Sequence, residues 1–162
     1  NGHLLGIFVF FQIGITSKTT VFNKIFGTAK YFWFYTKFNT ITGITENVAL
    51  VDFEADHSTD TLKANLHAAM DGLKDCDGIL VLSDLAGGSP FNNASMCMAE
   101  RPDQRIEVLA GTNLPMVIEG ASMMAAYDDP LELAETLIPT GKDYIVRFEL
   151  VKHEDEADED GI

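Results

Sequence analysis

The first 45 residues of the chain contain no aspartate and no glutamate, although the sequence as a whole is strongly acidic. Their charged side chains are four lysines: Lys18, Lys24, Lys30 and Lys37. All 25 acidic residues therefore lie in residues 46–162, and the net charge of the chain is −14 at pH 7. Nucleic-acid binding needs a cationic surface, so this charge argues against a nucleic-acid partner.

Cysteine is scarce, and no long apolar run is present. The two cysteines, Cys76 and Cys97, have no metal-ligand spacing and are expected to be unpaired buried thiols in a reducing compartment. The apolar run from Leu4 to Phe11 is far shorter than the ~20 residues that span a bilayer, and it lacks the basic flank of a signal peptide. We therefore expect a cytoplasmic chain.

Strand and helix patterns alternate after residue 45. Short apolar runs predict strands at residues 48–53, 79–83 and 106–110. Helical spacing predicts helices that start at Ser58, Pro90, Leu114 and Pro130, the last of them stopping near Pro139 and Gly141. Residues 144–151 alternate in polarity, which is typical of a half-exposed edge strand. The sequence thus predicts an α/β fold with a doubly wound, mainly parallel sheet, helices on both faces and an edge strand.

The most informative segment is residues 78–91, GILVLSDLAGGSPF. An unbroken apolar run predicts a buried parallel strand, which Asp84 follows directly. Gly87 and Gly88 predict a turn, and Ser89 is expected to cap a helix with Pro90 at its first position. Backbone N–H groups at a helix start attract anions, so we expect a small anion site beside an acid.

Asp84 and Ser89 also have a purely structural interpretation. Asp84 could serve only as a turn former at a strand end, and Ser89 only as a helix cap. A second loop, Gly111-Thr112-Asn113, follows the strand at 106–110. Ligands of open α/β sheets bind beyond the carboxyl ends of the strands, so this loop is also expected at the site.

Three separated motifs together resemble the enzyme IIA component of the mannose family of the bacterial sugar phosphotransferase system. They are the segment above with its continuation Asn92-Asn93-Ala94, the segment GITENVALVDF at 43–53, and AGTNLPM at 110–116. The resemblance covers about residues 40–151, and it implies that the edge strand at 144–151 is antiparallel. It implies a homodimeric phosphocarrier that accepts phosphate from the histidine-containing phosphocarrier protein. The phosphate then passes to enzyme IIB and serves the membrane permease subunits.

The resemblance also assigns roles to the residues of the loop. A histidine at the end of the first strand would accept the phosphoryl group, with Asp84 fixing its tautomer and orientation. The amides after Gly87 and Gly88 and the hydroxyl of Ser89 would hold the phosphoryl oxygens. No metal and no cofactor is implied.

The acceptor histidine is missing from the place where the resemblance puts it. Counting back about 25 residues from Asp52 reaches Gly27 and Thr28, and neither is histidine. His3 follows a glycine, but it lies far from Asp52 and is a weak candidate.

Three explanations compete. The protein has become a regulatory homologue, or His3 is the acceptor after a long insertion, or the first 40 residues are a wrong reading of the gene. We favour the third, because Phe, Lys, Asn, Ile and Tyr dominate the segment and these residues have AT-rich codons. An uninterrupted frame in the re-sequenced 5′ end, with no alternative upstream histidine, would rule it out.

The change in composition after the acid-free N-terminal residues and the acidic run at the end of the chain predict three parts. These are an anomalous segment at 1–40, an enzyme IIA-like domain at 41–151 and an acidic flexible tail at 152–162. The remaining histidines are expected to be structural: His57 in a loop, His67 at a helix surface or core edge, and His153 in the tail. The methionines of the helices are expected to pack in the core, although some could line a dimer contact.

Three functions remain open from the sequence. The first is the phosphocarrier, cytoplasmic and peripheral to the permease. The second is a regulatory or binding homologue without phosphate chemistry. The third is an unrelated small-molecule enzyme that uses Asp84 as a base.

Overall fold

The computed structural model of the chain describes residues 5–11, 42–44, 46–53 and 57–150. Four strands and four longer helices follow one another along these residues, with one short 3₁₀ helix. They are β1 (Leu5–Phe11), β2 (Val48–Asp52), α3 (Thr59–Gly72), β3 (Gly78–Ser83), α4 (Ser89–Ala99), β4 (Ile106–Ala110), α5 (Leu114–Met123), η2 (Met124–Ala126) and α6 (Pro130–Asp143).

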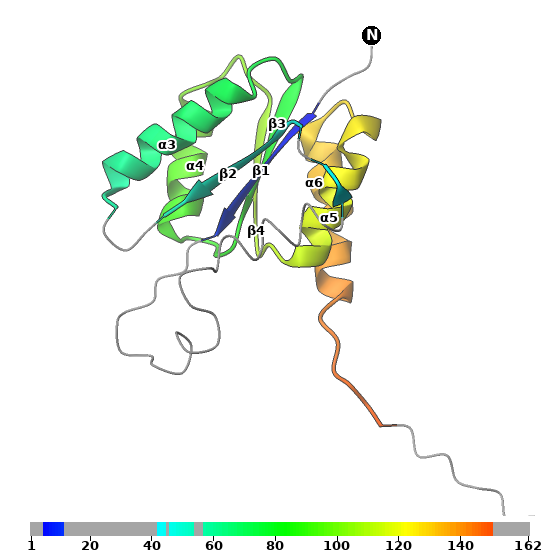
Figure 1. Cartoon of the computed structure of the whole chain (residues 1–162). Coiled ribbons are helices and arrows are strands. Elements are labelled where there is room, and N and C mark those ends of the chain that lie inside the picture. Colours follow the sequence, from blue (N-terminus) through cyan, green and yellow to red (C-terminus); the bar gives the residue numbers. More distant parts are fainter. Residues whose placement is uncertain (1–4, 12–41, 45, 54–56, 151–162) are drawn as a thin grey trace, which may run out of the picture.

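The strands form one parallel sheet with the order β2-β1-β3-β4. Helices α3 and α4 lie on one face of this sheet, and α5 and α6 lie on the other (Figure 1). This is the doubly wound α/β architecture that the alternating pattern predicts. The carboxyl ends of the strands therefore meet along one edge, where ligands of such sheets bind.

Strand β3 is buried along its whole length, which explains its unbroken apolar run. Its side chains alternate between two cores. Ile79 and Val81 pack toward α3 and α4, whereas Leu80 and Leu82 pack toward α5 and α6. The first core also contains Leu62, Leu66, Met70, Ala94 and Cys97, and the second contains Met116, Val117, Leu133 and Leu137.

Helix α3 begins as the sequence predicts. The hydroxyl oxygen of Ser58 accepts a hydrogen bond from the backbone N–H of Thr61 at 3.1 Å, and Asp60 lies in the first turn. A side-chain cap of this kind satisfies one of the N–H groups that a helix start leaves without a partner. None of the helices in the described part of the chain combines the length and apolar character needed to cross a bilayer.

Strand β1 is not among the strands that the sequence predicts; its residues form the apolar run that is too short to span a bilayer. It occupies the centre of the sheet, pairing with β2 from Ile7 to Phe11 and with β3 from Leu5 to Phe10. The sheet therefore includes residues that precede the predicted boundary near residue 40. The assignment of residues 1–40 as a separate segment stays a prediction.

Helix α6 does not stop near Pro139, contrary to the sequence prediction. It continues through this proline to Asp143. A proline inside a helix removes one backbone hydrogen bond and costs about 3 kcal/mol. Tertiary contacts of the same helix offset this loss: Leu133 and Leu137 are fully buried, and the carbonyl of Gly141 accepts a hydrogen bond from Asn113 Nδ2 at 2.9 Å.

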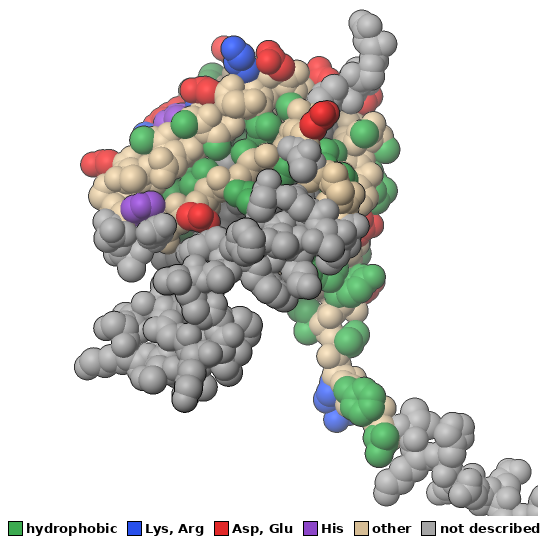
Figure 2. Space-filling model, viewed as in Figure 1, with side chains coloured by type: hydrophobic (Ala, Val, Ile, Leu, Met, Phe, Trp, Pro, Cys, Tyr) green, Lys and Arg blue, Asp and Glu red, His purple; other side chains and the backbone are tan. Residues whose placement is uncertain are grey.

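The antiparallel edge strand expected at 144–151 is also not found among the described residues. Residues 145–150 belong to no strand, and every described strand pair is parallel. We call residues 145–150 the C-terminal arm. The arm runs away from the end of α6 (Figure 1), and apolar side chains lie on its surface (Figure 2). Ile145, Val146, Phe148 and Leu150 are between 76% and 85% exposed. A strand forms only where a neighbouring strand pairs its backbone, and no described strand pairs with the arm.

Gly141 provides a test of the packing between α5 and α6. A Cβ atom at this position would lie 2.4 Å from Met116 Sδ and 2.9 Å from Met116 Cγ, and Met116 is itself buried. We expect Gly141→Ala to lower the free energy of unfolding by about 1–3 kcal/mol, measured by urea denaturation, because the core must shift to accept the methyl group.

Gly72→Ala is the matched control, because no atom lies within 4 Å of a Cβ built there and the residue ends helix α3. This change should leave stability unchanged or raise it by up to about 1 kcal/mol. Equal effects of the two substitutions would contradict the packing described for α6.

Candidate functional site

The predicted anion site lies in the turn between β3 and α4. We call residues 84–88 the Asp84 loop; it leaves the carboxyl end of β3 at Ser83 and enters α4 at Ser89. Gly87 has a φ of +77°, a conformation that glycine adopts without steric cost. The N–H of Gly88 bonds to the carbonyl of Leu85 at 3.1 Å, which closes the turn.

The start of α4 differs from the sequence prediction in one respect. Gly88 is the N-cap residue, and no side chain caps the helix. Ser89 and Pro90 occupy the first two helical positions, so Ser89 is one position too far along to act as the cap. Proline has no N–H, so Ser89 and Phe91 carry the backbone N–H groups of this first turn. A cap-free helix start keeps these groups available to an anion.

Asp84 lies half-buried at the beginning of the loop. Its Oδ1 accepts a hydrogen bond from the N–H of Leu85 at 2.7 Å. This contact is the turn-forming role that the plain structural interpretation expected. A carboxylate has several acceptor positions, so the turn contact is compatible with an additional role in orienting a ligand.

The second predicted loop lies directly beside the first. The N–H of Thr112 and its Oγ1 both donate to the carbonyl of Ser83, at 3.1 Å and 2.7 Å, and the N–H of Gly111 donates to the carbonyl of Asp84 at 3.2 Å. Asn113 has a structural role, because its side chain caps α5 and bonds to Gly141. The fold thus brings the two predicted loops together at one edge of the sheet.

The acceptor histidine is the part that sequence and structure leave unassigned. Phe10, near the end of β1, pairs with Ser83, so the carboxyl end of β1 lies next to the start of the Asp84 loop. Gly27, Thr28 and His3 all lie outside the described residues. Leu5, two positions after His3, pairs with Gly78 at the opposite end of β3 from Asp84.

The two histidines within residues 57–150 lie away from the Asp84 loop in the sequence and belong to other elements. His57 directly precedes the cap of α3, and His67 lies in the middle of that helix. His67 is partly exposed, as expected for a residue at the core edge. His153 lies outside the described residues.

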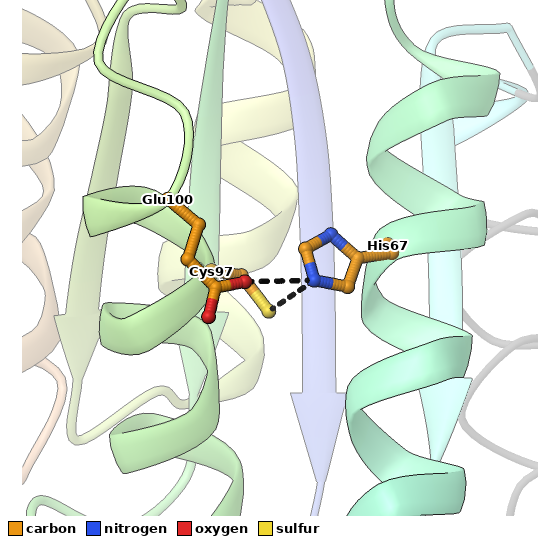
Figure 3. A group of neighbouring side chains, drawn as sticks. All are labelled: His67, Cys97 and Glu100. Atoms are coloured by element: carbon orange, nitrogen blue, oxygen red, sulfur yellow. Dashed lines mark hydrogen bonds and ion pairs between the residues drawn. The ribbon is translucent and has the colours of Figure 1, made fainter.

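His67 belongs to a polar cluster between α3 and α4 that the sequence analysis missed. Its Nε2 lies 3.1 Å from Glu100 Oε2 and 3.7 Å from the sulfur of Cys97 (Figure 3). Lys63 Nζ contacts the other oxygen of Glu100 at 2.5 Å, and burial raises the pKa of the Cys97 thiol. The positions of His67 and Lys63, four apart on α3, were the one signal in the sequence that these side chains share a helix face.

His, Cys and Glu are common metal ligands, but the surroundings of this cluster do not suit a cation. Arg101 Nε and one terminal guanidinium nitrogen lie 3.3 Å and 3.1 Å from His67 Nδ1. A guanidinium can only donate, so Nδ1 must accept and the ring proton resides on Nε2, which then donates to Glu100. A metal would need the lone pair of Nε2 and would face the positive charges of Lys63 and Arg101. The cluster of Lys63, His67, Glu100 and Arg101 therefore links α3 to the end of α4, and we call it the tether.

A pocket of about 490 Å³ lies next to this tether, at the amino ends of β3 and β4. Its charged lining consists of Lys74, Arg101 and Arg105 together with Asp77, Glu100 and Asp103. Three positive and three negative groups give it no preference for an anion. The pocket also lies at the opposite end of the sheet from the Asp84 loop, so it is not the predicted site.

Comparison with known proteins gives the same assignment as the motifs. A family model described as "PTS system fructose IIA component" matches residues 34–137. The chain is 37% identical over 105 residues to the mannose-specific EIIAB component of Escherichia coli K12, which covers 64% of the chain and 31% of that protein. It is 35% identical over 83 residues to the fructose-specific EIIA component of Bacillus subtilis, covering 51% of the chain and 56% of that protein. The chain therefore matches only about a third to a half of the length of these relatives.

Solved structures agree on the fold. The phosphotransferase system component EIIA from Streptococcus agalactiae superimposes with a TM-score of 0.71 at 25% identity, covering 89% of this chain and 97% of that one. The mannose/sorbose-specific IIA subunit from Enterococcus faecalis superimposes with a TM-score of 0.70 at 24% identity, covering 93% and 98%.

The tether gives a pH-dependent prediction. The hydrogen bond from Lys63 lowers the pKa of the Glu100 carboxyl below its ordinary value of 4.5. A lowered carboxyl pKa stabilises the folded state above pH 4.5, and this contribution is lost as pH falls through the lower, folded-state pKa. We expect Glu100→Gln to destabilise the protein slightly at pH 7, with a difference from wild type that shrinks below pH 4.5, measured by urea denaturation across pH.

Glu135→Gln is the control, because it removes one exposed charge from α6 without touching the tether. A wild-type advantage over Glu100→Gln that grows on acidification would contradict the tether.

Proposed function

The chain belongs to the family of PTS fructose IIA components, and from this we propose that it relays a phosphoryl group between two proteins of a sugar phosphotransferase system. It receives the group from the histidine-containing phosphocarrier protein and passes it to enzyme IIB. The membrane permease couples this phosphoryl transfer to sugar uptake. The transfer takes place in the cytoplasm, at the periphery of the permease.

The observation that carries this proposal is the arrangement at the Asp84 loop. A carboxylate, a cap-free helix start and the end of the central strand β1 lie within one short stretch of the sheet edge. The amides of Ser89 and Phe91 carry partial positive charge that suits phosphoryl oxygens. The carboxylate suits an imidazole, whose tautomer and orientation it fixes.

The transfer needs little covalent chemistry from the protein. The nitrogen of an acceptor imidazole attacks phosphorus in line, a new N–P bond forms, and the N–P bond of the donor phosphohistidine breaks with its electron pair returning to the donor ring. Asp84 stabilises the acceptor ring as it becomes cationic. The helix start and Ser89 hold the three equatorial oxygens, so the protein contributes position and charge.

One observation favours a second candidate function. The position at which the family resemblance expects the histidine is Gly27 and Thr28. A chain with this sequence and no substitute acceptor is a regulatory or binding homologue that keeps the fold without the phosphate chemistry.

Incubation with the phosphorylated carrier protein separates these functions. Acid-labile, base-stable label on a histidine of a chain whose N-terminus has been verified by intact mass supports the phosphocarrier. Absence of label on such a chain supports the regulatory homologue. Turnover of a free small molecule without any carrier protein would instead favour an enzyme that uses Asp84 as a base.

For a chain that takes label, Asp84→Asn should slow phosphoryl transfer by about 10- to 100-fold, because the amide neither orients nor stabilises the cationic ring as a carboxylate does. Rapid-quench measurement of the label gives the rate. Asp129→Asn is the matched control, since Asp129 caps α6 and lies outside the Asp84 loop. An undiminished rate in Asp84→Asn would remove this residue from the mechanism.

We further infer that two copies of the chain associate through the C-terminal arm. The arm exposes its alternate apolar side chains, and β4 is an edge strand with β3 as its neighbour in the described sheet. An arm that pairs with β4 of a second copy would bury these side chains and complete the backbone hydrogen bonds of both segments. This placement also accounts for the strand-like alternation at 144–151.

Neighbouring positions in the arm test this dimer. Phe148→Ser removes an apolar side chain that is 85% exposed in the single chain and should shift the protein toward monomer, measured by sedimentation equilibrium. Arg147→Ser places the same residue one position earlier, on the opposite side of an extended segment, and should leave the dimer intact. Equal association constants for the two variants would contradict pairing through the arm.

A further inference from the structure

We propose that Ser83 is a positioning residue for the anion at the start of α4, with its hydroxyl donating a hydrogen bond to an oxygen of the bound phosphate or phosphoryl group. This proposal rests on the proposed function for the chemistry of the ligand. Its evidence, however, is a separate feature of the structure that neither the motifs nor the comparisons assign.

The Ser83 side chain is fully buried, and its hydroxyl oxygen makes no hydrogen bond. Ser83 is the one residue of the described chain with this property. A buried hydroxyl without a partner destabilises the folded state, and native structures rarely keep one without a reason. The backbone carbonyl of the same residue is, by contrast, bonded twice to Thr112.

The direction of the side chain follows from the pleat of β3. Residues two apart along a strand share one face, so Ser83 lies on the same face as Ile79 and Val81. Both of those residues pack in the core that α3 and α4 cover. Ser83 is the last residue of β3, and α4 begins after the five-residue Asp84 loop. Its hydroxyl therefore lies on the α4 side of the sheet, at the end of the strand from which the loop turns into that helix.

A group that enters this place would find donors from two directions. The amides of the first turn of α4 approach from the helix, and the Ser83 hydroxyl approaches from the sheet. A hydroxyl is both a donor and an acceptor, and with a fully ionised phosphate it acts as the donor. A hydrogen bond to a charged group is stronger than one between neutral groups, so an anion offsets the destabilisation that the unpaired hydroxyl causes in the free protein.

The proposal predicts opposite effects of one substitution on stability and on binding. Ser83→Ala removes the unpaired hydroxyl and should raise the melting temperature of the phosphate-free protein by about 2–5 °C. The same variant should bind inorganic phosphate about 10-fold or more weakly, followed through the amide NMR shifts of Gly87 to Phe91. Ser83→Thr keeps a hydroxyl and should restore most of the affinity.

Ser122→Ala serves as the matched control. Ser122 lies exposed on α5, and its hydroxyl already bonds to the carbonyl of Ile118 at 2.8 Å. Neither the phosphate affinity nor the shifts near Gly87 should change in this variant. A lower melting temperature in Ser83→Ala would overturn the proposal, because it would mean that the hydroxyl has a stabilising partner in the free protein. An unchanged phosphate affinity would overturn it as well.

The two proposals fail in different experiments. If the wild-type protein binds phosphate through Ser83 but takes no label from the carrier protein, the phosphocarrier function is refuted and the anion site remains. If the wild-type protein and the Ser83→Ala variant take label at the same rate, only the role of Ser83 is refuted. A wild-type protein whose Gly87 to Phe91 amides do not respond to phosphate sinks the role of Ser83 directly.

Discussion

The carbonyl oxygen of Ser83 accepts two hydrogen bonds from Thr112, and the rest of the site depends on this contact. The Asp84 loop and the loop at 111–113 belong to different βα units and are not adjacent in the sequence. Strand pairing between β3 and β4 brings them to the same edge, but pairing alone stops at Ser83 and Ala110. The Thr112 bonds extend the ladder one step beyond the sheet. They fix the direction in which the chain leaves β3, and with it the position of Asp84 and of the helix start that follows.

The sheet supports this arrangement because β3 is buried on both faces. Two cores meet it from opposite sides, and each contains fully buried leucines from its helices. A close-packed strand has little freedom to slide or tilt, so the loop that leaves it starts from a fixed point. Variation at the site is thereby confined to the loops, which is the usual division between scaffold and function in open α/β sheets.

Local patterns predicted much of this fold. The cap at Ser58, the buried strand at residue 79 and the strand at 106–110 were all expected, because each is determined by neighbours in the sequence. The features that sequence analysis missed depend on partners distant in the chain. Strand β1 needs β2 and β3 to define it, the passage of α6 through Pro139 needs the packing around Gly141, and the His67 tether joins two helices. Gly88 rather than Ser89 caps α4, because the loop geometry, not residue preference, sets the boundary.

Helix α4 joins the two polar regions of the molecule, with the Asp84 loop at its beginning and Glu100 directly after its end. An acid at the end of a helix faces the negative pole of the backbone dipoles, and here Lys63 compensates it. The charge at the C-terminal end of α4 is thus compensated within the protein. The partial positive charge at its N-terminal end has no capping side chain, so a bound anion would supply the compensating charge. A phosphoryl group bound there would compensate the charge at the N-terminal end as well. Binding and release of the group would therefore change the stability of α4 and the strength of its contact with α3.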